Sequence, residues 1–360
     1  MMIIYLSKSN GRFTKNMLRR RYEMKRTLLW IVVVVMSLSM IAMVGLSGCK
    51  EDTAAGGDST AELKKAEDIT IGFSLWTMQF TFFQNVEKGV RDACEDLGFE
   101  YVMIDQNSDA TKMVQDLNTL IDQGVDGIVS TPVDPGAIGP SVQAARDAGI
   151  PFVCADIGKS GPVNALLISD NFNGGELAAE YIDSILGDNT KKLGLGNCLP
   201  QWTYARQRGE GFLAKAMELG YEVASNIIVQ TPSAEGGYDT CQQILSAVPD
   251  VAGLFFVSGR EAVGAANAAA AAGKDIVVVG YNGDPEEFQA IKDGVLDATI
   301  LQEPYYIGYK SVELLAEILM EGASYENAEV NVPVKLVTPD NYMDIADDIL
   351  EKTGNSAFPE

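Results

Sequence analysis

The residues best suited to bind a small polar molecule stand in short stretches that directly follow apolar, strand-like segments. In the first half of the chain these stretches supply aromatic rings and carboxyl groups, from Trp76, Phe80, Phe82, Phe83, Asp134 and Asp156. In the second half they supply mainly guanidinium, hydroxyl and amide groups, from Trp202, Arg208, Ser258, Arg260, Asn282 and Gln302. Aromatic rings cover the C–H faces of a sugar, whereas the polar groups exchange hydrogen bonds with its hydroxyls. The set therefore predicts a binding site for an uncharged polyol.

Several of these side chains also have a structural interpretation. One of the paired phenylalanines could belong to a helix core, and Asp134 could cap the helix that follows it. Arg208 could pair with Glu210 on a helix surface, where an exposed ion pair contributes roughly 0–1 kcal/mol. The aromatic residues that could instead pack one lobe of the fold against another are Trp76, Phe80 and Trp202. Asp156 and Asn282 fit a ligand site best, because ligands bind at the carboxyl ends of parallel strands.

The composition excludes several function classes. The chain contains no histidine, so it has no Ser–His or Cys–His nucleophile pair and lacks the commonest metal ligand. It also lacks a dinucleotide fingerprint, a Walker A motif, a Gly-x-Ser-x-Gly motif and an EF-hand loop. We therefore expect a binding protein rather than an enzyme, with no catalytic residue, no cofactor and no metal ion. The net charge of −23 and the isoelectric point near 4.3 argue against a nucleic-acid partner.

Much of the chain between Leu97 and Gly280 consists of two similar sequence repeats. The paired segments are 88–100 with 210–222, 125–129 with 251–255 and 148–153 with 272–277, at offsets between 122 and 126 residues. A nearly constant offset indicates two similar units, each of the size of a small domain. Two such units leave a cleft between them, and small ligands bind preferentially in clefts between domains.

Short apolar runs alternate with helical patterns through both units. Strand-like runs include Gly127–Ser130 and Ile276–Tyr281, and a single late strand is expected over Val332–Leu336, after a helix over Tyr305–Met320. Alternating strands and helices predict parallel sheets that are covered by helices on both faces. The expected fold class is therefore α/β, with two similar doubly wound parallel-sheet lobes.

The amino-terminus has the features of an export signal. Met24-Lys25-Arg26 precedes the apolar run Leu28 to Val44, and eight of the 27 basic residues but only one of the 50 acidic residues lie in 1–48. Leu46-Ser47-Gly48-Cys49 resembles the lipobox of bacterial lipoproteins, which implies lipidation of Cys49 and an extracytoplasmic, membrane-anchored protein. The alternative is an uncleaved membrane anchor. The other cysteines, Cys94, Cys154, Cys198 and Cys241, are interpreted as small buried residues.

The stretch from Ile69 to about Leu336 resembles the ribose-type periplasmic sugar-binding proteins, which serve ABC importers. The segments that carry the resemblance are Phe82-Phe83, Gly127–Pro132, Gly149–Val153, Ser169-Asp170-Asn171, Arg206–Phe212, Val278–Gly283 and Ala298–Gln302. By position, Phe82 and Phe83 would sandwich the sugar ring, with Trp202 nearby. The residues that would bind hydroxyls are Asp156, Arg208, Asn282 and Gln302.

The sequence departs from the pentose-binding members of that family at five of these positions. Ile157, Asn282 and Ser258 stand where those members have Arg, Asp and Asn. Trp76 and Phe80 replace small polar residues. Fewer charged groups and more aromatic surface imply a ligand other than ribose.

The resemblance also implies three connections that cross between the lobes, near 169–171, 302–304 and 331–333. The expected division is a signal peptide 1–48 (with Met24 as the start), a linker 49–67, lobe 1 at 68–169 plus 303–332, lobe 2 at 170–302 plus 333–348, and a tail 349–360. The expected function is capture of a sugar or sugar-like molecule between the lobes by a monomer that delivers it to an ABC permease. The alternative is a sensor that presents its ligand to a signalling receptor.

Overall fold

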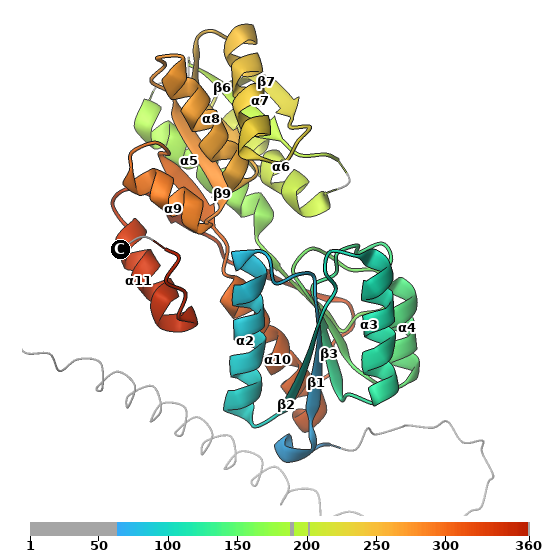
Figure 1. Cartoon of the computed structure of the whole chain (residues 1–360). Helices are drawn as coiled ribbons and strands as arrows, with labels where there is room; N and C mark the ends of the chain where they lie inside the picture. Colours follow the sequence, from blue (N-terminus) through green and yellow to red (C-terminus); the bar gives the residue numbers. More distant parts are fainter. Residues whose placement is uncertain (1–62, 188–190, 201, 359–360) are drawn as a thin grey trace, which may run out of the picture. The chain divides into compact units, whose positions relative to one another are not determined.

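A computed structural model describes residues 63–187, 191–200 and 202–358, which fold into two α/β lobes, each built on its own six-stranded sheet (Figure 1). The expected signal peptide, Cys49 and most of the expected linker lie outside these residues. In the described part of the chain, no helix is both long enough and apolar enough to span a membrane. The predicted fold class is confirmed.

The sheet of the first lobe is parallel throughout, with the strand order β11-β5-β4-β3-β1-β2. Its strands are β1 (Thr70–Leu75), β2 (Glu100–Asp105), β3 (Gly127–Ser130), β4 (Phe152–Ala155), β5 (Ala165–Ser169) and β11 (Ala328–Val332). Strands β3, β4 and β5 are buried along their whole length, as expected for apolar strands covered on both faces. Because the strands are parallel, their carboxyl ends meet at one edge of the sheet.

The sheet of the second lobe has the order β12-β10-β9-β8-β6-β7, so each strand has a counterpart at the same place in the first sheet. Its strands are β6 (Lys192–Asn197), β7 (Glu222–Ile228), β8 (Val251–Phe256), β9 (Val277–Asn282), β10 (Ala298–Leu301) and β12 (Lys335–Val337). The last strand differs in direction, because β12 runs antiparallel to β10 whereas β11 runs parallel to β5. The two sheets agree with the duplication in the sequence.

Helices cover both faces of each sheet (Figure 1). In the first lobe one face carries α2 (Thr81–Leu97) and α10 (Pro304–Glu321), and the other α3 (Ala110–Gln123) and α4 (Gly139–Asp147). In the second lobe one face carries α5 (Asn171–Leu186) and α6 (Thr203–Glu218), and the other α7 (Ala234–Ala247), α8 (Gly259–Ala271) and α9 (Pro285–Lys292). A last helix, α11 (Tyr342–Thr353), packs against α9 and α2.

Glycines allow close packing of the helix pair on one face of each lobe. A Cβ at Gly89 of α2 would lie 2.1 Å from the carbonyl oxygen of Tyr305 in α10. A Cβ at Gly211 of α6 would lie 1.9 Å from the carbonyl oxygen of Phe172 in α5. Both distances are far below van der Waals contact, so a side chain at either position would force the helices apart. Gly89 and Gly211 occupy equivalent positions in the repeated segments 88–100 and 210–222.

The chain crosses between the lobes three times. Helix α5 follows β5 of the first sheet but covers the second, and α10 follows β10 of the second sheet but covers the first. The third crossing joins β11 to β12. One backbone and one side-chain contact tie the crossings together: Asp170 N donates to Val332 O over 2.8 Å, and the side chains of Glu303 and Lys335 form an ion pair.

Two expectations about the end of the chain need correction. The single late strand expected over Val332–Leu336 is two strands in different sheets, because Pro333 has no N–H for a strand ladder and separates them. The segment expected to be a tail from residue 349 begins inside α11. Beyond that helix, Phe358 is 8% exposed and packs edge-on against Phe288, with the ring centroids 4.9 Å apart.

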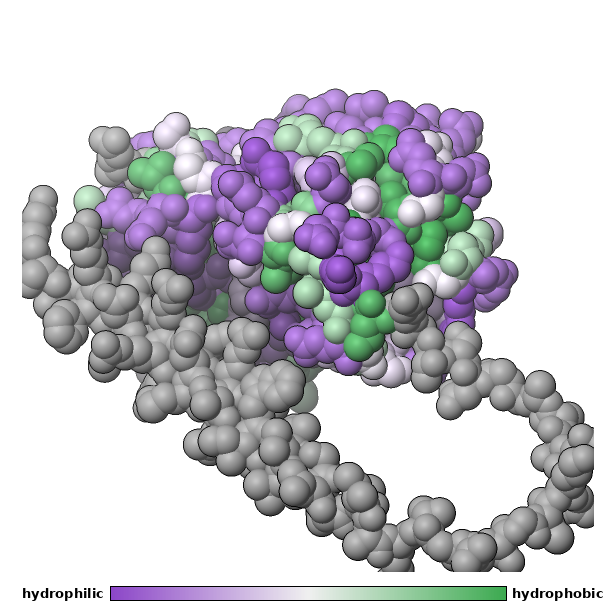
Figure 2. Space-filling model, turned by 90° about the horizontal axis from the view of Figure 1, so that it is seen from below, coloured by the Kyte–Doolittle hydropathy of each residue, from purple (hydrophilic) through white to green (hydrophobic). Residues whose placement is uncertain are grey.

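One face of the described residues has a mainly polar surface (Figure 2). On the face shown in Figure 2, hydrophilic residues cover most of the surface that is not grey, and hydrophobic residues form smaller patches between them.

Candidate functional site

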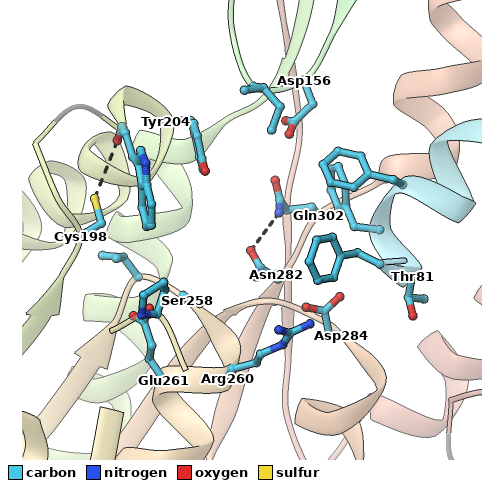
Figure 3. A pocket seen from close by; sticks show the side chains of 18 of the residues that line it. Thr81, Asp156, Cys198, Tyr204, Ser258, Arg260, Glu261, Asn282, Asp284 and Gln302 are labelled. Atoms are coloured by element: carbon cyan, nitrogen blue, oxygen red, sulfur yellow. Dashed lines mark hydrogen bonds between the residues drawn. The ribbon is translucent and has the colours of Figure 1, made fainter. Parts of the chain in front are cut away.

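A cavity of about 290 Å³ opens between the two lobes at the carboxyl ends of their strands. Its lining includes every residue that was predicted from the sequence to contact a ligand, except Asp134. Figure 3 shows part of this lining. Those residues are Trp76, Phe80, Phe82, Phe83, Asp156, Trp202, Arg208, Ser258, Arg260, Asn282 and Gln302. Side chains more than 200 residues apart in the sequence therefore face one cavity, because the carboxyl ends of the strands in both sheets border it.

Asp134 does not line this cavity, and we remove it from the candidate set. Its carboxylate is exposed, and Oδ1 accepts a hydrogen bond from Gly136 N over 2.9 Å. Asp134 therefore stabilises a local turn, a structural role similar to the helix capping that was the alternative to ligand binding. The helix that follows begins at Gly139 rather than at Pro135, so a turn separates Asp134 from α4.

The first lobe contributes an aromatic wall around Phe83. The ring of Phe83 lies 5.0 Å from that of Trp76 and 5.2 Å from that of Phe82, measured between centroids. Phe83 itself is only 6% exposed and belongs to the core of the lobe, whereas Trp76 and Phe82 are half-buried. The indole N–H of Trp76 donates to Ser108 Oγ over 3.1 Å, which helps to fix the ring. Trp76 and Phe82 thus offer the cavity ring surface that Phe83 supports from behind.

The second lobe holds Arg208 in one orientation from several sides. Nε donates to Asn171 Oδ1 over 2.8 Å, and Nη1 donates to Val257 O and to Asn282 Oδ1, each over 3.0 Å. The guanidinium also lies 3.8 Å from the ring centroid of Tyr281. Because Arg208 is only 4% exposed and this well bonded, its remaining N–H groups are preorganised to donate to a molecule in the cavity.

Asn282 and Gln302 extend this hydrogen-bonded group to the first crossing. Gln302 Nε2 donates to Asn282 Oδ1 over 3.1 Å, and Ser169 Oγ donates to Gln302 Oε1 over 2.8 Å. Figure 3 shows the amides of Asn282 and Gln302 facing each other in the middle of the cavity. Oδ1 of Asn282 therefore serves as a shared acceptor between Gln302 and Arg208.

Asp156 is the buried carboxyl group that the first lobe presents to the cavity (Figure 3). Burial raises its pKa from the usual 3.8 to about 6, although Arg208 and the backbone N–H groups of Ile157 and Ser169 favour the charged form. Its backbone has φ +63°, a left-handed conformation that costs a non-glycine residue free energy and is common at ligand sites. Asn282, which ends β9 as Asp156 follows β4, also has a positive φ, +116°.

One aromatic–cation contact joins the two lobes across the cavity. The guanidinium carbon of Arg260 lies 5.2 Å from the ring centroid of Phe80, within the range of a cation–π interaction. Phe80 belongs to the first lobe and Arg260 to the second, and both line the cavity.

Sequence reasoning missed several acidic residues of the lining. Glu261 is 3% exposed, its Oε2 has no hydrogen-bond partner, and burial raises its pKa from 4.5 to about 8 despite the nearby charge of Arg208. Asp284 also has a raised pKa, through burial and the neighbouring charge of Glu286. The signals were present in the sequence, since Glu261 and Asp284 lie one and two residues after Arg260 and Asn282.

The charges of the lining disfavour an anionic ligand. Four carboxyl groups, those of Asp156, Glu261, Asp284 and Glu286, face the cavity together with the two guanidinium groups of Arg208 and Arg260. Among the described residues no group of three or more Cys, Asp or Glu side chains could hold a metal ion. The arrangement suits a molecule that offers hydroxyl groups and an apolar ring face.

Comparisons with known proteins agree with this chemistry. Residues 71–323 match the family model described as "Periplasmic binding protein domain". The ribose import binding protein of Bacillus subtilis (strain 168) is 32% identical over 314 residues, which cover 85% of this chain and 98% of that protein. The D-apiose import binding protein of Actinobacillus succinogenes is 27% identical over 61% of this chain and 72% of that protein.

A solved structure supports the fold. The periplasmic ribose ABC transporter structure from Conexibacter woesei aligns with a TM-score of 0.75 and 22% sequence identity, over 80% of this chain and 98% of that chain. At that identity the likeness bears on the arrangement of the lobes and not on the ligand.

Proposed function

Because this chain belongs to the periplasmic binding protein family, we propose that it captures an uncharged sugar or related polyol between its two lobes and delivers it to an ABC importer. The names of its relatives support this proposal, since they are import binding proteins for ribose and D-apiose. An importer component is favoured over a sensor for the same reason.

The proposal rests mainly on one observation, that the two lobes contribute different kinds of side chain to the same cavity. Trp76 and Phe82 on the first lobe offer ring faces, and Arg208, Asn282 and Gln302 offer hydrogen-bonding groups that are already fixed. A sugar ring with its C–H face against the aromatic wall would direct its hydroxyls towards the polar group. Asp156 would accept hydrogen bonds from up to two sugar hydroxyls, each contributing about 1.5–3 kcal/mol.

The mechanism follows from the three crossings between the lobes. A ligand that contacts both lobes stabilises the closed arrangement, because that arrangement makes all of its contacts at once. Binding therefore shifts the population of lobe arrangements, and the permease would recognise the closed one. Affinities near micromolar, about −8 kcal/mol, would allow both capture and release.

The ligand itself is proposed to differ from ribose. Ile157, Ser258, Trp76 and Phe80 depart from the residue types of the pentose-binding members. The changes at Trp76 and Phe80 add ring surface to the cavity, and Ile157 removes a charged group. A ligand with a broader apolar face or fewer hydroxyls would fit this lining.

We also propose that the protein acts outside the cytoplasm as a lipid-anchored monomer, with the lipid on Cys49. The support is the basic and apolar segment that precedes Leu46-Ser47-Gly48-Cys49, and the polar linker after it. Metabolic labelling with an alkyne fatty acid should modify the wild-type chain and not the Cys49→Ala variant. Equal labelling of both would contradict the anchor.

A thermal-shift screen followed by calorimetry tests the binding function. The probes are D-ribose, D-apiose, D-allose, D-galactose, methyl β-D-galactofuranoside and myo-inositol, with ribose 5-phosphate and D-galacturonate as anionic controls. At a hundredfold excess over Kd a bound ligand stabilises by about 2.7 kcal/mol, which is readily seen as a rise in Tm. We expect at least one neutral probe to bind and both anions to bind more weakly than their parent sugars. No binding by any neutral probe would contradict the proposal.

A further inference from the structure

Asn171 does not line the cavity, but its side chain is hydrogen-bonded to Arg208, which does. It is the first residue of α5, directly after the first crossing between the lobes, and it is 2% exposed. It is not among the residues that line the cavity, so it would not contact a bound sugar. Any effect of Asn171 on binding must therefore pass through its neighbours.

The amide of Asn171 makes two hydrogen bonds in opposite senses. Oδ1 accepts from Arg208 Nε over 2.8 Å, and Nδ2 donates to Ser169 O over 2.9 Å. These partners fix which end of the amide faces the arginine, because a flipped amide would set two donors against each other. Arg208 thus receives an acceptor whose orientation is set by the backbone of the first crossing.

The contact of Asn171 closes a ring of five residues, in which Ser169 takes part through both its backbone carbonyl and its hydroxyl group. Arg208 Nη1 donates to Asn282 Oδ1, which also accepts from Gln302 Nε2, while Gln302 Oε1 accepts from Ser169 Oγ. Asn171 completes the ring between Ser169 and Arg208. The ring joins the first two crossings to three residues that line the cavity, so a change in lobe arrangement that disturbed Ser169 or Gln302 would reach Arg208.

The second crossing offers no counterpart to Asn171. Asp170 and Glu303 are the residues immediately before helices α5 and α10, which makes Ser169 equivalent to Gln302 and Asn171 equivalent to Pro304. The equivalent residues Ser169 and Gln302 bond to each other, but Pro304 has no side-chain amide. The first crossing therefore bonds to Arg208 directly, through Asn171, whereas the second reaches Arg208 only through Asn282.

We propose that Asn171 is a positioning residue for ligand binding, which orients the Arg208 guanidinium towards the cavity and couples that orientation to the first crossing through Ser169. This inference rests on the proposed function for its effect on affinity. The orientation of Arg208 itself does not depend on which ligand binds.

Five variants in the full chain, one of them Arg208→Ala as a reference, separate positioning from a structural role. Asn171→Ala removes the acceptor for Arg208, Asn171→Asp keeps it, and Asn173→Ala is the matched control on an exposed position of the same helix turn. Asn171→Ala in an Arg208→Ala background tests whether the effect of Asn171 passes through the arginine. Thermal unfolding of each variant shows that it is folded.

The first measurement is independent of the ligand. In ¹⁵N spectra the Nε–H of Arg208, assigned by its absence in Arg208→Ala, should be protected from exchange in the wild type, Asn171→Asp and Asn173→Ala. It should exchange at least about tenfold faster in Asn171→Ala, because the bonded acceptor is lost. Unchanged protection in Asn171→Ala would overturn the inference.

The second measurement is calorimetry with the tightest-binding probe among D-ribose, D-apiose, D-allose, D-galactose, methyl β-D-galactofuranoside and myo-inositol. Asn171→Ala should weaken binding about tenfold, Asn171→Asp about threefold or less, and Asn173→Ala not at all. In the Arg208→Ala background the further loss should be under about twofold. An equal loss in both backgrounds would overturn positioning through Arg208. If no probe binds to the wild type, the proposed function fails, and the exchange measurement decides the inference.

Discussion

The two lobes share one scaffold but present different chemistry to the cavity between them. Their sheets have matching strand orders, and each carries a helix pair that meets at a glycine. At the strand ends, however, the first lobe offers aromatic rings and Asp156, whereas the second offers Arg208, Asn282 and an amide partner in Gln302. Packing therefore constrains the duplicated helices and strands, while the loops at the strand ends are free to diverge.

The backbone retains the symmetry where the side chains have lost it. Asp156 and Asn282 lie at the carboxyl ends of the equivalent strands β4 and β9, and both have a positive φ. A carboxyl group in one lobe thus stands at the position that an amide occupies in the other. The first lobe contributes an acceptor there, and the second contributes a group that both donates and accepts.

The largest expected effect tests the shared scaffold. Gly211→Ala in the second lobe should lower the free energy of unfolding by about 3 kcal/mol, because its Cβ would overlap the carbonyl oxygen of Phe172. Gly89→Ala in the first lobe should cost a similar amount against Tyr305. Urea unfolding of the two variants measures both. A loss in one lobe and none in the other would break the proposed equivalence of the helix pairs.

The next effect tests the polar side of the cavity. Arg208→Ala should weaken sugar binding about a hundredfold, because it also leaves the buried acceptors of Asn171 and Asn282 without their donor. On the aromatic side Phe82→Ala should cost less, about tenfold, since the wall retains Trp76. Calorimetry with the tightest-binding probe measures both variants. A greater loss from Phe82→Ala would reverse the assigned division of roles.

A third effect concerns Glu261, a buried acid that the second lobe carries near Arg208. Glu261 is protonated more readily in the folded state than in the unfolded state, because burial raises its pKa from 4.5 to about 8. The stability that the protein gains from holding this proton is therefore fully present below about pH 4.5 and is lost as the pH rises towards 8. Glu261→Gln should unfold like the wild type at pH 4 and be about 1–3 kcal/mol more stable at pH 9.

The exposed Glu286 provides the matched control for that measurement. Glu286→Gln changes the same charge at the same cavity but removes no buried carboxyl group, so it can act only by relieving the repulsion that raises the pKa of Asp284. Its stability should therefore differ from that of the wild type by less than that of Glu261→Gln at pH 9. Urea unfolding at pH 4, 7 and 9 compares the three proteins. Parallel curves for Glu261→Gln and the wild type would contradict the unpaired state of Glu261.

The smallest effect tests the carboxyl group of the first lobe. If a sugar hydroxyl donates to ionised Asp156, whose pKa burial raises to about 6, affinity should be constant above about pH 7, about twofold weaker at pH 6 and no more than about tenfold weaker at pH 5. Asp156→Asn should bind more weakly and lose this dependence on pH. Asp134→Asn, outside the cavity, should keep it. A flat profile for the wild type would remove Asp156 from the ligand contacts.

Much of this architecture could be predicted from the sequence because it depends on local patterns. Apolar runs and turn residues located the strands, and strand ends located Asp156 and Asn282, since ligands meet parallel sheets at those ends. The late strand was misread because its apolar residues continue on both sides of Pro333, and composition does not show that the two halves join different sheets.

The hydrogen-bonded ring could not be predicted in the same way. Its members lie up to 133 residues apart, and their partners are set by how the crossings pass one another. Ser169 and Asn171 stand in a motif that the sequence assigned only to a crossing between lobes. Glu261 looked like an ordinary acidic residue in the first turn of a helix, and only its burial distinguishes it.

The central claim is that one molecule contacts both lobes at once, and the two tryptophans of the described chain report on it directly. Trp76 lines the cavity from the first lobe and Trp202 from the second. Their indole N–H signals, assigned with Trp76→Phe and Trp202→Phe, can be followed in ¹⁵N spectra during titration with the tightest-binding sugar of the screen. Both signals should shift with a single midpoint equal to the calorimetric Kd. A sugar that shifts one signal and leaves the other in place would contradict a site shared by the two lobes.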